Sequence, residues 1–464
     1  MRHTPFYLFV VLLFVRPAYA QTTQPEKQTD SITRLFIQAM NGIRPDSAYQ
    51  FLGEDMRKQY SPEKWQKTFH AGIQPMVPFK DLQFAGTKDG MNVYHVNSTI
   101  PLLLYAHLDA RGKIDGFWFD NPNKATKPAK VLSDNPLKSR LDTIVEAAVR
   151  PYMQLSGSVG LSTGIRYNGQ DYFYNYGTIR LGGDTLPDNH TIYEIGSITK
   201  TFTSTLLALA VVQKKVTLDQ PITEFLPDSV AANPALKGIT LKQLANHTAG
   251  FPKLPSNLDW TRPEQPYEHY DQAHLFRYMK TATLVSTPGK VYAYSNLGVG
   301  LLGVILERIY GMDYAALVSK YITGPQGMKH TGIAVYGKTA QGYDGTLRAA
   351  EMWDMNSVKS AGMLRSDAAD LLKYATLQLE EGKDPLHQAI TLAHQPTFND
   401  GTTKIGLAWN YVQQQDDWIW HNGMTGGFRS YLVADTATHN AVVVLANSSN
   451  GTEVIGQQIL IYLK

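Results

Sequence analysis

Apolar residues are spaced in two different ways in the first part of the chain. Over residues 31–76 they recur every three or four positions, which predicts short helices. They alternate with polar residues in three later segments, which predicts strands at 91–96, 102–108 and 114–119. The glycine-containing turn at 109–113 joins the last two strands as a hairpin. Helices followed by a small sheet predict a compact α+β module over residues 21–120.

Residues 121–138 show no periodic pattern and are rich in Asn, Lys, Pro and Ala, which is typical of a linker. A second domain is therefore predicted over residues 139–464. Its periodicity predicts helices at 141–152, 239–250, 297–310 and 454–463, and a further helix that begins directly after Ser197. It also predicts strands at 158–167, 172–177, 405–412, 418–422, 428–434 and 441–446, and a long loop at 251–275. Because strands lie at both ends, we expect a mixed α+β or α/β fold, in which one antiparallel sheet joins distant segments around an inserted helical layer.

The first twenty residues have the pattern of a secretory signal. A basic start is followed by an apolar run that is too short to span a bilayer, and Ala18-Tyr19-Ala20 precedes Gln21 as a cleavage site. The alternative is a retained membrane anchor. No later run is apolar enough to be an integral membrane segment, so we expect an exported protein, periplasmic or secreted.

Composition excludes several classes of function. A formal charge of +3 without a cluster of Lys and Arg gives no sign of a nucleic-acid partner. The chain has no Cys, which excludes disulfides and thiolate metal sites. Three histidines of the first module (His70, His95 and His107) lack metal-ligand spacing, and neither H-x-H nor H-E-x-x-H occurs, so we predict no metal and no cofactor.

Ser197 and Lys200 carry the strongest chemical signal. Gly196 ends an extended segment, so Ser197 falls at the first turn of the predicted helix, and Lys200 shares its face three residues later. A serine hydroxyl becomes a good nucleophile when an adjacent base takes its proton. A lysine among apolar neighbours loses part of its preference for the charged form and can be that base. This S-x-x-K spacing is typical of acyl-transfer enzymes.

Two other motifs resemble hydrolase signatures but have structural explanations. Ser61-Pro62-Glu63-Lys64 is a second S-x-x-K, in which proline after serine indicates a capped helix start. Residues 160–164 fit G-x-S-x-G, but an extended segment and a hairpin turn follow where a nucleophile elbow needs a helix.

Tyr294-Ser295-Asn296 supplies further groups that acyl transfer needs. Alternate residues of an extended turn point the same way, so Tyr294 and Asn296 are expected to face one cleft. Tyr294 beside cationic Lys200 would act as a phenolate-like base and then as an acid. Asn296 can bond both Lys200 and a substrate carbonyl.

The strand opposite the serine is expected to carry an H-x-G motif, for which the chain offers two candidates. His330-Thr331-Gly332 follows a Gly- and Pro-rich stretch and is predicted to be a turn. His421-Asn422-Gly423 lies between strand-like runs and is preferred, with Gly423 allowing a substrate to lie against the backbone. The amide groups of Ser197 and Met424 would then form an oxyanion hole.

With these motifs in this order, residues 137–464 resemble the serine β-lactamase-like hydrolases. That family includes class C β-lactamases, low-molecular-mass DD-peptidases and related esterases. The resemblance implies that Ser197 is acylated, that Lys200 and Tyr294 shuttle protons, and that Asn296 holds the substrate amide. His247-Thr248-Ala249-Gly250, residues 360–366 and Gly426-Gly427-Phe428 support it.

The third motif departs from class C β-lactamases, which carry lysine where this chain has His421. A largely neutral histidine gives a weaker positive charge for a substrate carboxylate, which argues against efficient antibiotic hydrolysis. Asn422 replaces a hydroxyl, and Arg429 is a possible substitute ligand for that carboxylate.

Two functions are compatible with these residues. The first is an acyl-serine hydrolase acting on β-lactams, D-Ala-D-Ala peptides of peptidoglycan or small esters. The second is a catalytically silent protein that binds peptidoglycan fragments or β-lactams.

Overall fold

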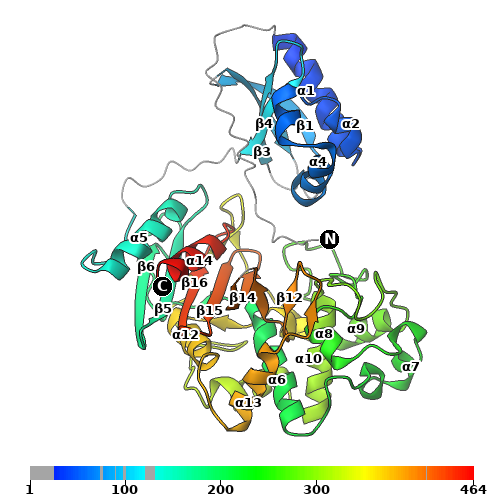
Figure 1. Cartoon of the computed structure of the whole chain (residues 1–464), viewed down its shortest axis with the longest axis vertical. Helices are drawn as coiled ribbons and strands as arrows, with labels where there is room; N and C mark the ends of the chain where they lie inside the picture. The colour runs from blue at the N-terminus through cyan, green and yellow to red at the C-terminus, as the bar shows by residue number, and fades with distance from the viewer. Residues whose placement is uncertain are drawn as a thin grey trace. The chain divides into compact units, whose positions relative to one another are not determined.

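The chain separates into two compact units, residues 1–127 and 128–464, which are described separately (Figure 1). The computed structural model describes residues 26–73, 77–88, 90–97, 101–120, 131–413 and 415–463. The predicted signal at residues 1–20 therefore lies outside the described residues, as does most of the predicted linker. None of the described helices is both long enough and apolar enough to cross a membrane.

The first unit packs short helices against a four-stranded antiparallel sheet. Its helices are α1 (Glu26–Asn41), α2 (Pro45–Tyr49), α3 (Glu54–Gln59), α4 (Pro62–Thr68) and the π-helical turn η1 (Phe69–Ile73). The strands follow sequence order in the sheet: β1 (Lys80–Lys88), β2 (Met91–Asn97), β3 (Pro101–Leu108) and β4 (Ile114–Asp120). Aromatic side chains fill the core, where the ring of Phe36 lies edge-on to Phe117 at 4.9 Å between centroids.

The expected helices are present in this unit. Three of its four described strands, β2, β3 and β4, correspond to the predicted strands. Strand β1 was not predicted, because it lies at the edge of the sheet and most of its residues are exposed, so it lacks an alternating apolar pattern. Ser61 caps α4 by accepting a hydrogen bond from the amide of Lys64 at 3.3 Å. The structural interpretation of this second S-x-x-K is therefore confirmed.

An eight-stranded antiparallel sheet forms the centre of the second unit, in the order β11-β12-β13-β14-β15-β16-β5-β6. Strand β16 pairs with β5, which joins the end of the domain to its beginning, as expected from the sequence. The strands are β5 (Gly160–Tyr167), β6 (Gln170–Gly177), β11 (Phe398–Asn399), β12 (Lys404–Ile405), β13 (Asn410–Val412), β14 (Gln415–Met424), β15 (Arg429–Asp435) and β16 (Asn440–Ala446). Ser162 of the G-x-S-x-G segment lies inside β5, so this segment is not a nucleophile elbow.

Helices cover both faces of this sheet. Helices α5 (Arg140–Met153) and α14 (Glu453–Tyr462) pack together on one face (Figure 1). The other face carries α12 (Ala368–Leu377) and the helical layer, which contains α6 (Thr199–Val212), α7 (Asp228–Ala231), α8 (Leu241–Ala245), α9 (Gln272–Met279), α10 (Asn296–Tyr310), α11 (Tyr314–Val318) and α13 (Pro385–His394). Side chains along each strand alternate between the two faces. Tyr431 therefore lies in the core between the sheet and helices α5 and α14, and Leu432 lies in the core between the sheet and the helical layer.

Short elements connect these layers. They are the 3-10 turns η3 (Gly196–Ile198), η4 (Ile222–Phe225), η5 (Pro234–Leu236) and η7 (Asn356–Ala361), the π-helical turn η6 (Ser319–Thr323), and the two-residue strands β7 (Tyr193–Glu194), β8 (Gly342–Tyr343), β9 (Ala349–Ala350) and β10 (Arg365–Ser366). The helix predicted over 239–250 ends at Ala245, because His247 adopts a left-handed backbone with φ of 61°.

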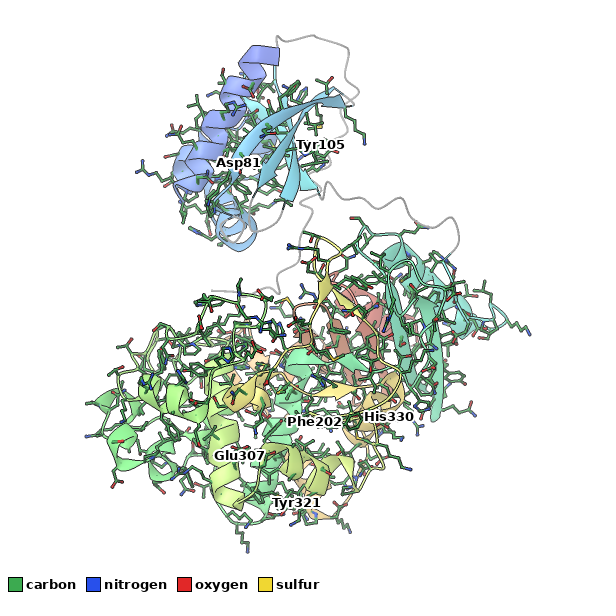
Figure 2. All side chains as sticks on the ribbon, turned by 180° about the vertical axis from the view of Figure 1, so that it is seen from behind. Asp81, Tyr105, Phe202, Glu307, Tyr321 and His330 are labelled. Atoms are coloured by element: carbon green, nitrogen blue, oxygen red, sulfur yellow. The ribbon has the colours of Figure 1, made fainter. Side chains whose placement is uncertain are left out.

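Helix α6 is buried on every side. Its residues from Thr199 to Ala210 are all buried. Phe202, which Figure 2 labels, lies on this helix. Its ring stacks on Tyr374 of α12, with 3.7 Å between ring centroids. A helix that is enclosed all round gives a fixed platform for the turn at its N-terminus.

Candidate active site

The turn that carries Ser197 is held by backbone contacts from two directions. Strand β7 pairs with β10, and the amide of Ile195 donates to Leu364 O at 3.0 Å. Gly196 has φ of 48°, and a Cβ there would lie 2.7 Å from the amide nitrogen of Met424. Only glycine fits that combination of left-handed backbone and close approach. The position of Ser197 is thus set by main-chain geometry.

Ser197 and Lys200 meet as the spacing predicts. The Lys200 Nζ lies 2.9 Å from Ser197 Oγ and donates to the carbonyl of Ala361 at 2.5 Å. Lys200 is fully buried, and burial lowers its pKa well below 10.5, with a smaller contribution from the positive charge of Lys253. Burial therefore favours the uncharged form of the amine, which has the lone pair that a general base requires.

Tyr294 lies on the other side of this pair. Lys200 Nζ is 4.9 Å from the centre of the Tyr294 ring. Burial raises the pKa of the Tyr294 phenol, and its interaction with the Ser197 hydroxyl offsets this only in part. Burial thus disfavours both the phenolate-like form of Tyr294 and the cationic form of Lys200 that we expected.

His247 supports Tyr294 in a way that the sequence did not indicate. The two rings lie 4.4 Å apart between centroids. The amide of Ser295 donates to His247 Nδ1 at 3.2 Å, and the amide of Ala293 donates to the His247 carbonyl at 2.7 Å. The H-T-A-G motif thus holds the Tyr294 segment in place.

Asn296 is placed in the site with a different partner from the expected one. Its amide nitrogen donates to the Tyr267 hydroxyl at 3.2 Å, and Lys200 donates to Ser197 and Ala361 instead. Asn296 Oδ1 is buried without a hydrogen-bond partner in the described structure. A buried acceptor without a partner is costly, so it is well suited to receive a substrate N–H.

His421 lies on β14 and is buried against the same centre. Its Nδ1 is 2.7 Å from the carbonyl of Asn422, so Nδ1 carries the proton. Nε2 is then a buried acceptor, for which the described structure provides no partner. Burial, with help from nearby Lys200, lowers the pKa of His421 to about 3. His421 is therefore neutral and presents a lone pair, whereas a carboxylate needs a donor.

The neighbours of His421 point elsewhere. Asn422 donates to Glu453 Oε1 of α14 at 2.6 Å, and Arg429 Nε donates to the carbonyl of Ser449 at 2.8 Å. Arg429 also feels the charges of Glu453 and Tyr152, on the α5–α14 face of the sheet. Both residues lie on the face away from Lys200, so the idea that Arg429 replaces a carboxylate ligand is wrong.

Gly423 and Met424 adjoin the serine turn. A Cβ at Gly423 would lie 2.1 Å from the carbonyl oxygen of Ile195. The glycine is therefore needed for the contact between β14 and the Ser197 turn, and the approach of a substrate to this backbone stays a prediction. Met424 is partly exposed at the end of β14, and its amide nitrogen lies next to Gly196.

Lys253 is a further residue of the site that the sequence did not reveal. Its carbonyl accepts from the Asn296 amide at 3.0 Å, and its charge reaches Lys200. The residue is exposed, yet protein atoms remove enough water from its ammonium to lower its pKa. No ion pair in the described part of the chain opposes that shift. The predicted loop 251–275 contained no signal for a specific cation.

His330, the rejected candidate for the third motif, lies in a turn after η6 and pairs with Asp367 instead. The structure thus places Lys200 beside Ser197 and Tyr294, with His421 close enough to feel the charge of Lys200. A hydroxyl, an amine, a phenol and an imidazole in one place are the kinds of group that acyl transfer uses.

Comparison with known proteins agrees with this chemistry. The family model described as Beta-lactamase matches residues 145–461. A β-lactamase of Pseudomonas fluorescens is 27% identical over 350 residues, covering 66% of this chain and 93% of that protein. A β-lactamase of Providencia stuartii is 28% identical over 283 residues, covering 60% and 68%. The crystal structure of a β-lactamase/D-alanine carboxypeptidase from Pseudomonas syringae has a TM-score of 0.62 at 24% identity, covering 70% of this chain and all of that one.

Proposed function

The chain belongs to the β-lactamase family of serine hydrolases, and from this membership we propose that it is an exported enzyme that forms an acyl-enzyme on Ser197. The observation that carries the proposal is the 2.9 Å contact between Ser197 Oγ and the buried Lys200 amine. A protein that only bound ligands would gain nothing from a neutral base beside an alcohol. This contact therefore favours the enzyme over the silent binding protein.

The reaction begins when Lys200 accepts the proton of Ser197 while Oγ bonds to the substrate carbonyl carbon. The amides of Ser197 and Met424 stabilise the oxyanion, and Asn296 Oδ1 accepts a hydrogen bond from the substrate. The carbonyl carbon then loses its amine or alcohol, which takes a proton from the neutral Tyr294 hydroxyl as Lys200 returns a proton to Tyr294. Water attacks the ester in the same way and releases the acid.

Small esters and D-Ala-D-Ala peptides are the preferred substrates. Neutral His421 gives no positive charge for the carboxylate of a β-lactam, which argues for slow antibiotic turnover. The Pseudomonas syringae relative, described as a β-lactamase/D-alanine carboxypeptidase, supports a peptide substrate. Lys253, beside Asn296, is suited to bind an acidic group on the acyl side of the scissile bond.

Substrate choice is tested by comparing a chromogenic cephalosporin, a D-Ala-D-Ala peptide and p-nitrophenyl acetate with the purified enzyme. We expect ester cleavage and slow cephalosporin turnover, and peptide mapping should locate a penicillin adduct on Ser197. Cephalosporin turnover near the diffusion limit of about 10⁸ M⁻¹s⁻¹ would contradict the role given to His421. Absence of an adduct with any lactam or activated ester would favour the binding protein. Export predicts a mature N-terminus at Gln21.

Removal of the Lys253 charge is expected to have two effects. Lys253→Gln should raise the pKa of Lys200, so the acidic limb of the kcat/KM profile moves to higher pH, since Lys200 must be neutral to act. It should also lower kcat/KM by roughly 10-fold for an acyl donor with a carboxylate, and little for a neutral one. The exposed Lys237→Gln is the matched control. Equal losses for charged and neutral donors would rule out a specific anion contact.

A further inference from the structure

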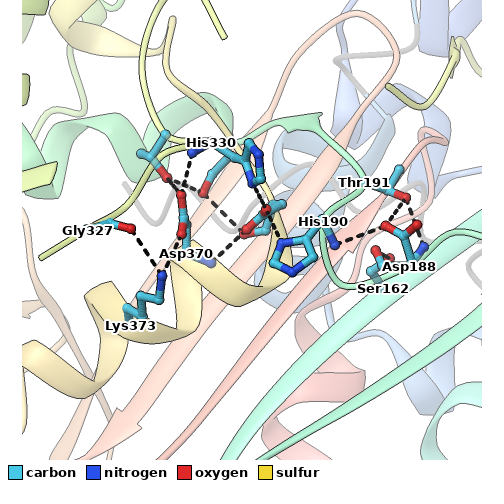
Figure 3. A network of polar contacts seen from close by, with 11 residues as sticks. Ser162, Asp188, His190, Thr191, Gly327, His330, Asp370 and Lys373 are labelled. Carbon is cyan, nitrogen blue, oxygen red and sulfur yellow. Dashed lines mark hydrogen bonds and ion pairs between the residues drawn. The ribbon is translucent and has the colours of Figure 1, made fainter. Parts of the chain in front are cut away.

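Three side chains from separate segments meet at one buried carboxylate in the second unit. His190 precedes β7, His330 follows η6, and Asp367 caps the N-terminus of α12 (Figure 3). Asp367 Oδ2 lies 3.0 Å from His190 Nδ1 and 2.7 Å from His330 Nδ1. The three ligand atoms all lie within 4.8 Å of one another. The acyl-transfer reaction makes no use of these groups.

Each member of this cluster, which we call the His-His-Asp cluster, is fixed by a second contact. The other oxygen of Asp367 accepts from the Asp370 amide at 2.7 Å, which leaves Oδ2 directed at the histidines. The amide of His330 donates to Asp370 Oδ2 at 2.6 Å, and that of His190 donates to Asp188 Oδ1 at 3.0 Å (Figure 3). Such supporting contacts are what orient ligands in metal sites.

The local charge favours a cation. The side chain of Asp367 is fully buried, and in the described part of the chain only histidines pair with it. Its neighbour Asp370 is also buried and pairs with Lys373 at 3.1 Å. Of these two buried carboxylates only Asp370 has a lysine partner, so Asp367 has no lysine or arginine among its ion pairs in the described residues. The side chains of His190 and His330 are 56% and 34% exposed, so an ion can enter from solvent.

We propose that the His-His-Asp cluster is a binding site for a divalent zinc ion. Two imidazole nitrogens and one carboxylate oxygen form a common zinc ligand set, with the remaining position open to water. Zinc bonds of about 2.0–2.1 Å place tetrahedral ligand atoms roughly 3.4 Å apart. The observed N–O separations of 2.7 and 3.0 Å require only a small outward movement. On binding, each Nδ1 offers its lone pair and the ring proton resides on Nε2.

The ion would act as a structural clamp. His190 and Asp367 lie at one end of the paired strands β7 and β10, whose other end continues through Glu194 into the Ser197 turn. The α12 start already contacts this segment, because the Ala369 amide donates to Asn189 O at 3.0 Å. Zinc would add a third link, through His330, and stabilise the folded state without touching the substrate.

Calorimetric titration of the whole protein with zinc chloride tests the site. We expect one equivalent of Zn²⁺ to bind, no binding of Mg²⁺, which prefers six oxygen ligands, and a higher thermal unfolding temperature with zinc. His190→Ala and His330→Ala should each weaken the affinity on the order of 10-fold or more. Asp367→Asn should do the same while keeping the helix cap, since asparagine caps equally well.

His274→Ala is the matched control, because His274 pairs with Asp271 at 2.8 Å on an exposed helix start without a second histidine. It should bind zinc as the wild type does. Lack of binding by the wild type, or binding that survives unchanged in the three cluster variants, would overturn the proposal. Absence of ester hydrolysis by the wild type would not, so the site is judged independently of the proposed function.

Discussion

Replacement of Ser197 by alanine is expected to lower kcat/KM for every hydrolysed substrate on the order of 10⁴-fold or more and to abolish the penicillin adduct. In the proposed reaction the Ser197 hydroxyl, 2.9 Å from the Lys200 amine, is the group that bonds to the acyl carbon. Lys200→Gln should have an effect of similar size, because the proton would have no acceptor at 2.9 Å. The double variant should be little worse than either single one, since the two residues act as one unit.

Ser204→Ala is the control for this experiment. Ser204 is a buried serine on the same helix and has no hydrogen-bond partner in the described structure. Its replacement should leave kcat/KM nearly unchanged. Hydrolysis that persists in Ser197→Ala, measured with p-nitrophenyl acetate and confirmed by intact mass, would refute the acyl-enzyme on Ser197.

Glu194→Gln is expected to stabilise the protein above pH 7 by about 3 kcal/mol relative to the wild type. Burial raises the pKa of Glu194 from its ordinary 4.5 to about 7. Its Oε1 accepts from the Trp353 amide at 2.6 Å, whereas Oε2 is buried without a hydrogen-bond partner in the described structure. Glutamine has the shape of the protonated acid and carries no charge, so it avoids the cost of a buried carboxylate.

The pH dependence has a definite sign. Below pH 4.5 the carboxyl is protonated in the folded and unfolded chains, and its full contribution to stability is present. Between pH 4.5 and about 7 the unfolded chain releases the proton first, so wild-type stability falls. Urea unfolding at pH 4, 6 and 8.5 should show a growing difference between variant and wild type. The exposed Glu381→Gln should show none, and a pH-independent difference for Glu194→Gln would disprove the shift.

Local rules were sufficient for the centre of the site but not for its surroundings. The spacing of Ser197 and Lys200 is sufficient to predict that their side chains are in contact, because residues three positions apart lie on the same face of a helical turn. Lys253 and Tyr267 reach Asn296 from the predicted loop 251–275, and His247 reaches Tyr294 from beyond the end of α8. Only tertiary packing brings these residues together. The burial that lowers the pKa of Lys200 and raises that of Tyr294 likewise depends on packing and has no local signal.

The third motif shows a different limit. Adjacent residues of a strand face opposite ways, so Asn422 must point away if His421 points toward the serine. The alternation of side chains along a strand is sufficient to place Asn422 on the face opposite to His421. The face on which Arg429 lies depends on how β15 pairs with β14, which the sequence does not show. Likewise the need for glycine at 423 arises from a carbonyl more than two hundred positions away.

The burial of α6 on every side has a consequence for local unfolding. Its amides can exchange with deuterium only when most of the surrounding unit opens, so they should be among the slowest in the chain. Ser197 therefore adjoins a helix that is expected to be among the last parts of this unit to unfold. Because the Ser197 turn adjoins this helix, inactivation by heat should coincide with global unfolding rather than precede it.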